Sequence, residues 1–134
     1  MMDGEEILKG KTITGMKLAD DRMALLVLFD EGQIVARCDA DCCSHTWIEH
    51  IELPADPFPA LVMSAEQLFF ESEEDGELKK YGFKIRTDKG VIDIDFRNAS
   101  NGYYGGSLTW GEDDYFYGGV FKQNISKNIW KEIP

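Results

Sequence analysis

Residues 81–97 read YGFKIRTDKGVIDIDFR, and this stretch decides which fold the chain can adopt. Apolar and polar side chains alternate twice, first over Tyr81–Thr87 and then over Ile92–Arg97. A period of two is typical of strands with one buried face and one face in water. Between the two runs, Asp88-Lys89-Gly90 has the aspartate and glycine that short hairpin turns favour. The stretch therefore predicts an antiparallel β-hairpin.

A second hairpin is predicted near the start of the chain. Met23–Phe29 is a continuous apolar run, as expected of a strand that is buried on both faces. Asp30-Glu31-Gly32 repeats the Asp-x-Gly turn, and Gln33–Cys38 follows as the partner strand. Weaker patterns predict four further strands, over residues 12–18, 60–70, 107–110 and 115–121.

These elements predict one mainly β domain over residues 1–134, at the margin of the α+β class. We expect about seven to eight strands in a single curled antiparallel sheet or a small barrel or sandwich. Hydrophobic residues make up 43% of the 134 residues, which is enough for one core. Ile125, Ile129, Trp130 and Ile133 have helical spacing, so a short C-terminal helix is expected. Residues 1–10 are expected to form a loose, charged lead-in.

The charge of the chain narrows its possible partners. The 25 acidic residues outnumber the 14 basic residues, and the net charge is −11. This argues against direct nucleic-acid or membrane binding, because both need a basic surface. The negative charge has two possible roles. It keeps the chain soluble, or it lets the chain dock onto basic surfaces, including those that normally hold nucleic acid. The chain has no apolar run near the roughly 20 residues of a membrane helix, and a cytoplasmic location is expected.

The cysteine-rich segment contains the residue types that zinc prefers, namely Cys38, Cys42, Cys43 and His45. The spacing argues against a metal site, because the side chains of adjacent cysteines point in different directions. His45 and His50 are expected on opposite faces of a strand, or about 140° apart on a helix. Reduced thiols that pack as small hydrophobic groups are the favoured interpretation, and no cofactor is expected.

Two catalytic arrangements are considered, and neither is favoured. Cys43 and His45 could share one face of a strand as a nucleophile and its base, but no third residue is evident to orient them. Asp93 and Asp95 resemble a pair of catalytic carboxylates, yet alternating aspartates are typical of the wet side of a sheet. The chain is therefore predicted not to be an enzyme.

The best binding candidates are aromatic residues beside glycines, since they combine a large contact area with an adaptable backbone. The alternative is that the same aromatic residues pack in the core of the domain and bind nothing. Acidic runs at 71–77 and 112–114 are candidates for meeting a basic partner. The candidate residues are Tyr103, Tyr104, Tyr115, Tyr117, Glu73, Glu74, Asp75, Asp113 and Asp114.

Four short motifs resemble a small uncharacterised domain family found mainly in bacteriophages and in bacteria that carry prophages. The motifs are Asp41-Cys42-Cys43, Trp47-Ile48-Glu49-x-Ile51, the strand from Gly90 to Ile94, and Ser100-Asn101-Gly102-Tyr103-Tyr104. The resemblance covers roughly residues 10–110. It implies a compact β-rich domain of phage or mobile-element origin, without catalytic residues to transfer. Residues 111–134 lie beyond the family-like part, and this extension is expected to carry what is particular to this chain.

Three functional hypotheses follow. The first is a non-enzymatic phage-type accessory protein that binds and inhibits a host protein, such as a defence factor, inside the bacterial cell. The second is a small-ligand or nucleotide-signal binder, in which Tyr103 and Tyr104 stack on a base; only four arginines are available for phosphates. The third is a cysteine-centred metal-binding domain. The oligomeric state is left open.

Overall fold

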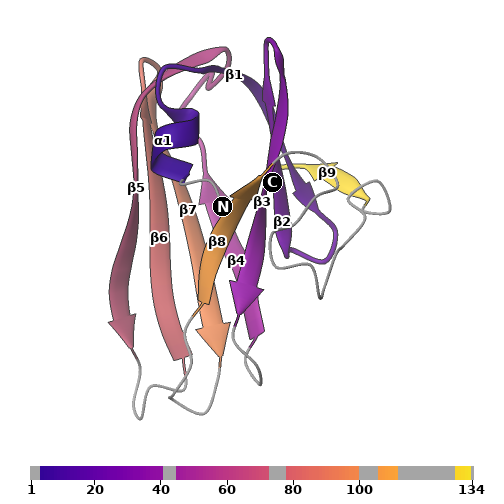
Figure 1. The fold of residues 1–134 in the computed structure, drawn as a ribbon, viewed down its shortest axis with the longest axis vertical. Coiled ribbons are helices and arrows are strands. Elements are labelled where there is room, and N and C mark those ends of the chain that lie inside the picture. The colour runs from indigo at the N-terminus through magenta and orange to yellow at the C-terminus, as the bar shows by residue number, and fades with distance from the viewer. Residues whose placement is uncertain (1–3, 41–44, 73–77, 100–105, 112–128, 134) are drawn as a thin grey trace.

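A computed structural model of the chain describes residues 4–40, 45–72, 78–99, 106–111 and 129–133 (Figure 1). One short helix and nine strands form within these ranges, and all the strand pairs are antiparallel. The predicted mainly β fold is confirmed. In chain order the elements are α1 (Gly4–Leu8), β1 (Thr12–Ala19), β2 (Ala24–Phe29), β3 (Gly32–Ala40), β4 (His45–Glu52), β5 (Ala60–Ser72), β6 (Leu78–Thr87), β7 (Gly90–Ala99), β8 (Gly106–Gly111) and β9 (Trp130–Glu132).

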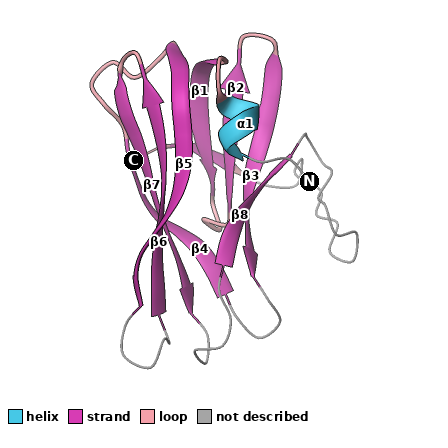
Figure 2. Ribbon diagram, turned by 60° about the vertical axis from the view of Figure 1, so that its left-hand side comes forward, coloured by secondary structure: helices cyan, strands magenta, loops and turns pink. Residues whose placement is uncertain are grey.

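The strands form one curled sheet in the order β4-β7-β6-β5-β1-β2-β3-β8, which does not close into a barrel. Strands β1 and β5 pair at only two positions, Thr12 with Leu61 and Ile13 with Ala60. This narrow junction divides the sheet into two groups of strands. One contains β4, β7, β6 and β5, and the other contains β1, β2, β3 and β8, with β9 beside β1. Figures 1 and 2 show helix α1 between the two groups, where it contacts β5.

The main core lies between the two groups of strands. Leu25 and Val27 of β2 share one buried cluster with Ile85 and Phe96 from the other group. The rings of Phe83 in β6 and Trp110 in β8 are 5.0 Å apart across it. The facing sides of the two groups therefore exclude water together, and the polar sides of the strands face outward.

A second, smaller cluster covers the other face of β2. It contains Ala24, Leu26 and Val35, and the half-buried Trp130 packs against it. The prediction that the apolar run at 23–29 is buried on both faces is therefore confirmed.

The hairpin predicted at residues 81–97 is confirmed as β6 and β7. Phe83 pairs with Ile94 in the ladder, and both side chains are buried. The turn needs glycine at position 90 for two reasons. The φ angle of Gly90 is +129°, and a Cβ atom there would lie 2.9 Å from the Cβ of Pro54.

The C-terminal segment differs from the prediction. Instead of a helix, Trp130–Glu132 forms strand β9, which pairs with Lys17–Ala19 of β1. The reason is tertiary. After β1 separates from β5, its backbone groups need a partner, and a strand satisfies them where a helix would not.

The N-terminal segment also differs from the loose lead-in expected for residues 1–10. Residues 4–8 form α1, and Leu8 is fully buried. A Cβ atom on Gly4 would lie 2.6 Å from Cδ1 of Trp110, so the helix packs closely on β8. The helix thus fills the space where the two groups of strands separate.

Candidate interaction face

All the binding residues predicted from the sequence lie outside the described residues. The same holds for Cys42 and Cys43, and for the predicted strand at 115–121. The candidate site therefore consists of other side chains, all within the described residues. The predicted binding residues concerned are Tyr103, Tyr104, Tyr115, Tyr117, Glu73, Glu74, Asp75, Asp113 and Asp114.

Strand β4, for which the sequence analysis named no element, carries the site. Ile48 and Ile51 are buried, and the residues between them, Glu49 and His50, both point outward at a bulge in the β4–β7 ladder. His45 and His50 are both exposed, so the prediction of opposite faces is wrong. The bulge inserts one residue and shifts the alternation. The two histidines are five positions apart on the strand, which corresponds to roughly 15 Å at about 3.3 Å per residue and is too far for both to bind one ion.

Trp47 is the central side chain of the exposed side of β4. Its ring stacks on the ring of His45, with centroids 5.3 Å apart and planes 19° apart. Its indole Nε1 donates a hydrogen bond to Oε1 of Glu49 at 3.4 Å. The half-buried tryptophan is therefore held in one orientation by both neighbours on its strand.

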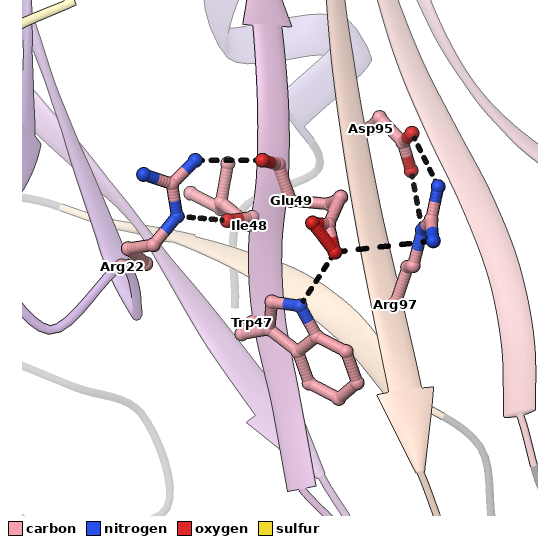
Figure 3. A network of polar contacts seen from close by, with 6 residues as sticks. All are labelled: Arg22, Trp47, Ile48, Glu49, Asp95 and Arg97. Carbon is pink, nitrogen blue, oxygen red and sulfur yellow. Dashed lines mark hydrogen bonds and ion pairs between the residues drawn. The ribbon is translucent and has the colours of Figure 1, made fainter.

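Arg97 of β7 pairs directly across from Trp47 in the ladder. Its guanidinium donates to Asp95 through Nε at 3.4 Å and through Nη2 at 3.2 Å, which is a two-point contact. Its Nη1 also lies 3.8 Å from Oε1 of Glu49. Figure 3 shows these side chains joined across the two strands. We call His45, Trp47, Glu49, Asp95 and Arg97 the interaction face.

Arg22 secures β4 from its unpaired side. Its Nε and Nη2 donate to the backbone carbonyls of Ile48 at 2.9 Å and Glu49 at 2.6 Å (Figure 3). The backbone amide of Ile48 donates to the carbonyl of Arg22 at 2.8 Å. Arg22 has a φ of +63°, which is rare for a residue other than glycine. This contact lies at the bulge, after which His50 faces outward as Glu49 does.

Two further ion pairs lie on the same group of strands. Lys84 lies 3.7 Å from Asp93, and Arg86 lies 3.3 Å from Glu66. Asp93 and Asp95, considered above as a catalytic pair, thus each face a cation. The surface is suited to recognising another charged and aromatic surface by contact.

Cys38 is the one cysteine that the structure describes, and it is buried in β3. Burial, with a smaller effect from the charge of Asp21, raises the pKa of its thiol to about 12. A zinc ligand or nucleophile must be a thiolate, and Cys38 remains protonated near neutral pH. Among the described residues, no group of three or more potential ligands could hold a metal ion.

We expect Cys38 to react slowly with iodoacetamide. In a Cys42→Ser/Cys43→Ser variant at pH 8, alkylation of the folded protein should be roughly a hundredfold or more slower than alkylation of the protein in urea. The reason is that the ionised fraction of a thiol falls tenfold for each unit by which its pKa is raised.

The raised pKa of Cys38 also means that the folded state keeps a proton that the unfolded state loses. Stability from this group should therefore decline as pH rises from about 9 to about 12. Equal alkylation rates for the folded protein and for the protein in urea would contradict the burial of the Cys38 thiol.

A groove of about 660 Å³ lies beside the turn between β2 and β3. Its charged side chains are Lys11, Asp30 and Glu31, and the Nζ of Lys11 lies 5.8 Å from the centre of the Phe29 ring. With two carboxylates to one ammonium, this lining does not favour an anionic ligand such as a nucleotide.

Comparison with protein families gave one match. A family model described as a domain of unknown function (DUF7448) matches residues 6–110. Comparison with curated proteins and with solved structures gave no match. None of the helices formed by the described residues has the length and apolar character needed to cross a membrane.

Proposed function

The chain belongs to the DUF7448 family, and we propose from its own residues that it is a non-enzymatic accessory protein that binds a host protein and blocks it. The observation that carries this proposal is the interaction face. Trp47 and Arg97 are the two residue types most often found at the energetic centres of protein interfaces, together with tyrosine. Here they are neighbours on two paired strands.

The rigidity of this face supports binding. A side chain that is already held in place loses little freedom when a partner covers it. Trp47 is held by His45 and Glu49, and Arg97 is held by Asp95 and Glu49. Arg22 fixes the backbone beneath them. The partner therefore meets a preformed surface.

The net charge of −11 supports a basic partner surface. Long-range attraction speeds the encounter of oppositely charged proteins and weakens as salt screens it. The resemblance of the sequence to a phage-associated family supports a bacterial host protein as the target, such as a defence factor, and a cytoplasmic site of action. A host protein that normally holds nucleic acid would present such a basic surface.

The nucleotide-binding alternative has less support, because all four arginines of the chain already have a role. Arg22 donates to backbone carbonyls, and Arg86 and Arg97 pair with carboxylates. Arg37 is 6% exposed, and burial lowers its pKa. Arg86 has a half-exposed side chain, but its guanidinium already pairs with Glu66, so it is not an unpaired cation for a phosphate.

The test is capture of the partner from bacterial lysate on the tagged chain, followed by affinity measurement with the purified partner. Trp47→Ala should weaken binding at least about thirtyfold, which corresponds to roughly 2 kcal/mol for an interface centre. Arg86→Ala is the matched control, because its ion pair lies on β6 outside the interaction face. Thermal unfolding of each variant checks that the fold is kept.

Three results would contradict the proposal. The first is affinity that is unchanged by Trp47→Ala in a folded variant. The second is affinity that does not fall between about 50 and 300 mM salt, which would remove the electrostatic component. The third is a captured partner whose own activity is unaffected when it is saturated with the chain, which would leave binding without inhibition.

A further inference from the structure

The side chain of Glu49 has an acceptor that the interaction face does not use. Both of its contacts fall on one oxygen, Oε1, which takes the indole N–H of Trp47 at 3.4 Å and lies 3.8 Å from Nη1 of Arg97. The second distance is too long for a hydrogen bond. No hydrogen bond within the described residues reaches the other oxygen, Oε2, and the Glu49 side chain is 40% exposed. Since each carboxylate oxygen can accept hydrogen bonds, Oε2 is available to a donor from outside the chain.

The charges of β4 and β7 are unbalanced in favour of acid. Both strands lie wholly within the described residues, and together they carry four carboxylates and one arginine, Arg97. Lys84 of β6 adds one cation 3.7 Å from Asp93, which still leaves an excess of negative charge. Glu52 pairs directly across from Asp93 in the ladder, and like charges in such positions repel each other. A cation brought by a partner would relieve this excess. The four carboxylates are Glu49, Glu52, Asp93 and Asp95.

The stacked rings of His45 and Trp47 favour a guanidinium over an ammonium group. His45 is exposed and Trp47 is half-buried, and their ring planes are only 19° apart. A guanidinium is planar, so it can lie flat on an aromatic ring while its N–H groups donate at the edge of that ring. Glu49 holds its carboxylate at the edge of the indole, because it accepts the indole N–H. Figure 3 shows this carboxylate linked to the indole of Trp47.

We propose that the interaction face receives an arginine side chain of the partner protein, which lies flat against the stack of His45 and Trp47 and donates to Oε2 of Glu49. The proposal rests on the proposed function and names the side chain by which the partner is recognised. A phosphate is disfavoured, because Arg97 already makes a two-point contact with Asp95. A second copy of the chain is disfavoured as well, since each of its four arginines already has the role described above.

The test uses synthetic peptides and NMR of the full chain, and it needs no host protein. The probe is an acetylated and amidated peptide in which arginine alternates with glycine. It should shift the indole N–H signal of Trp47, which is assigned by its loss in Trp47→Phe. The matched lysine–glycine peptide carries the same charge but no planar group, so it should bind at least about threefold more weakly.

Three variants locate the contact. Glu49→Gln keeps an oxygen for the indole N–H of Trp47 but removes the charge, so it should weaken binding of the arginine peptide about tenfold, as expected for a hydrogen bond between charged groups. Glu66→Gln is the matched control. It removes the same charge from an ion pair on β5, outside the interaction face, and should change the affinity less than about twofold. Trp47→Leu, followed through the amide signals of β4, should remove the preference for arginine over lysine.

Each other outcome overturns the proposal. Equal binding of the two peptides would exclude stacking of a guanidinium, and equal losses in Glu49→Gln and Glu66→Gln would leave only the general attraction of an acidic chain. A Trp47 signal that shifts with inorganic phosphate would assign the face to an anion. A doubled mass in sedimentation, with the same shift in the absence of peptide, would assign it to a second copy. If the peptide results hold while a captured host protein stays active, the proposed inhibition fails and the recognition of arginine stands.

Discussion

Phe96→Ala is expected to lower the free energy of unfolding by about 3–5 kcal/mol, the range for removing a buried phenylalanine ring. Phe96 is fully buried in β7, within the cluster that joins the two groups of strands. Its ring also supports Tyr81 by stacking at 5.0 Å. The truncation leaves a cavity at a position where neither group of strands can close over it. Urea unfolding monitored by tryptophan fluorescence measures the change.

The control for this prediction is Phe69, whose ring lies 5.3 Å from the Tyr81 ring that stacks on Phe96. Phe69→Ala should cost less than about 1 kcal/mol, because the Phe69 side chain is 57% exposed in the folded state. If Phe96→Ala does not fold, Phe96→Leu retains most of the volume and should cost less than about 1.5 kcal/mol. Equal losses for Phe96→Ala and Phe69→Ala would contradict the placement of the core.

Arg22→Ala is expected to lower the free energy of unfolding by about 2–3 kcal/mol, the range for hydrogen bonds from a charged donor. The guanidinium bonds two successive carbonyls of β4, at 2.9 and 2.6 Å. Among the described residues, strand β4 ends the sheet, and its one ladder is with β7. Removing the side chain therefore leaves backbone acceptors half-buried without their donors. The measurement is again urea unfolding.

Two comparisons separate the contact from other effects of this substitution. Arg22→Gly should cost about 1 kcal/mol less than Arg22→Ala, because glycine adopts the φ of +63° without strain. Arg86→Ala removes an arginine from an exposed ion pair with Glu66 and should cost less than about 1 kcal/mol. An Arg22→Ala loss no larger than that of Arg86→Ala would show that β4 does not need the contact.

Local patterns were sufficient for the hairpins. The alternation over residues 81–97 predicted β6 and β7, because each strand has one buried face and a short turn fixes the pairing. The continuous apolar run at 23–29 predicted a strand buried on both faces, and β2 has a cluster on each side. In these segments the local propensity and the tertiary environment agree.

The failures occurred where long-range contacts decide the structure. Trp130 has helical spacing with Ile129 and Ile133 but joins a strand, since β1 has an edge to fill. Residues 1–10 were expected to form a loose, charged lead-in, whereas Gly4 permits close packing of α1 on Trp110. The bulge in β4 interrupts the period of two, so Ile48 and Ile51 three residues apart concealed a strand.

The interaction face was missed for the same reason. Trp47 and Glu49 were noticed only as part of a family motif, and their positions fifty residues before Arg97 gave no sign that the side chains meet. Cross-strand pairing of β4 with β7 creates the contact. The acidic and aromatic residues favoured from the sequence remain predictions, because they lie outside the described residues.

By itself, the sequence determined the fold class, the two hairpins and the acidic character of the chain, because alternation, turn residues and charge act over a few neighbouring positions. Only the tertiary structure decided that the C-terminal segment pairs with β1, which arginine secures β4, and that Trp47 stands beside Arg97. These features depend on where distant segments pack, and burial of the shared core sets that packing.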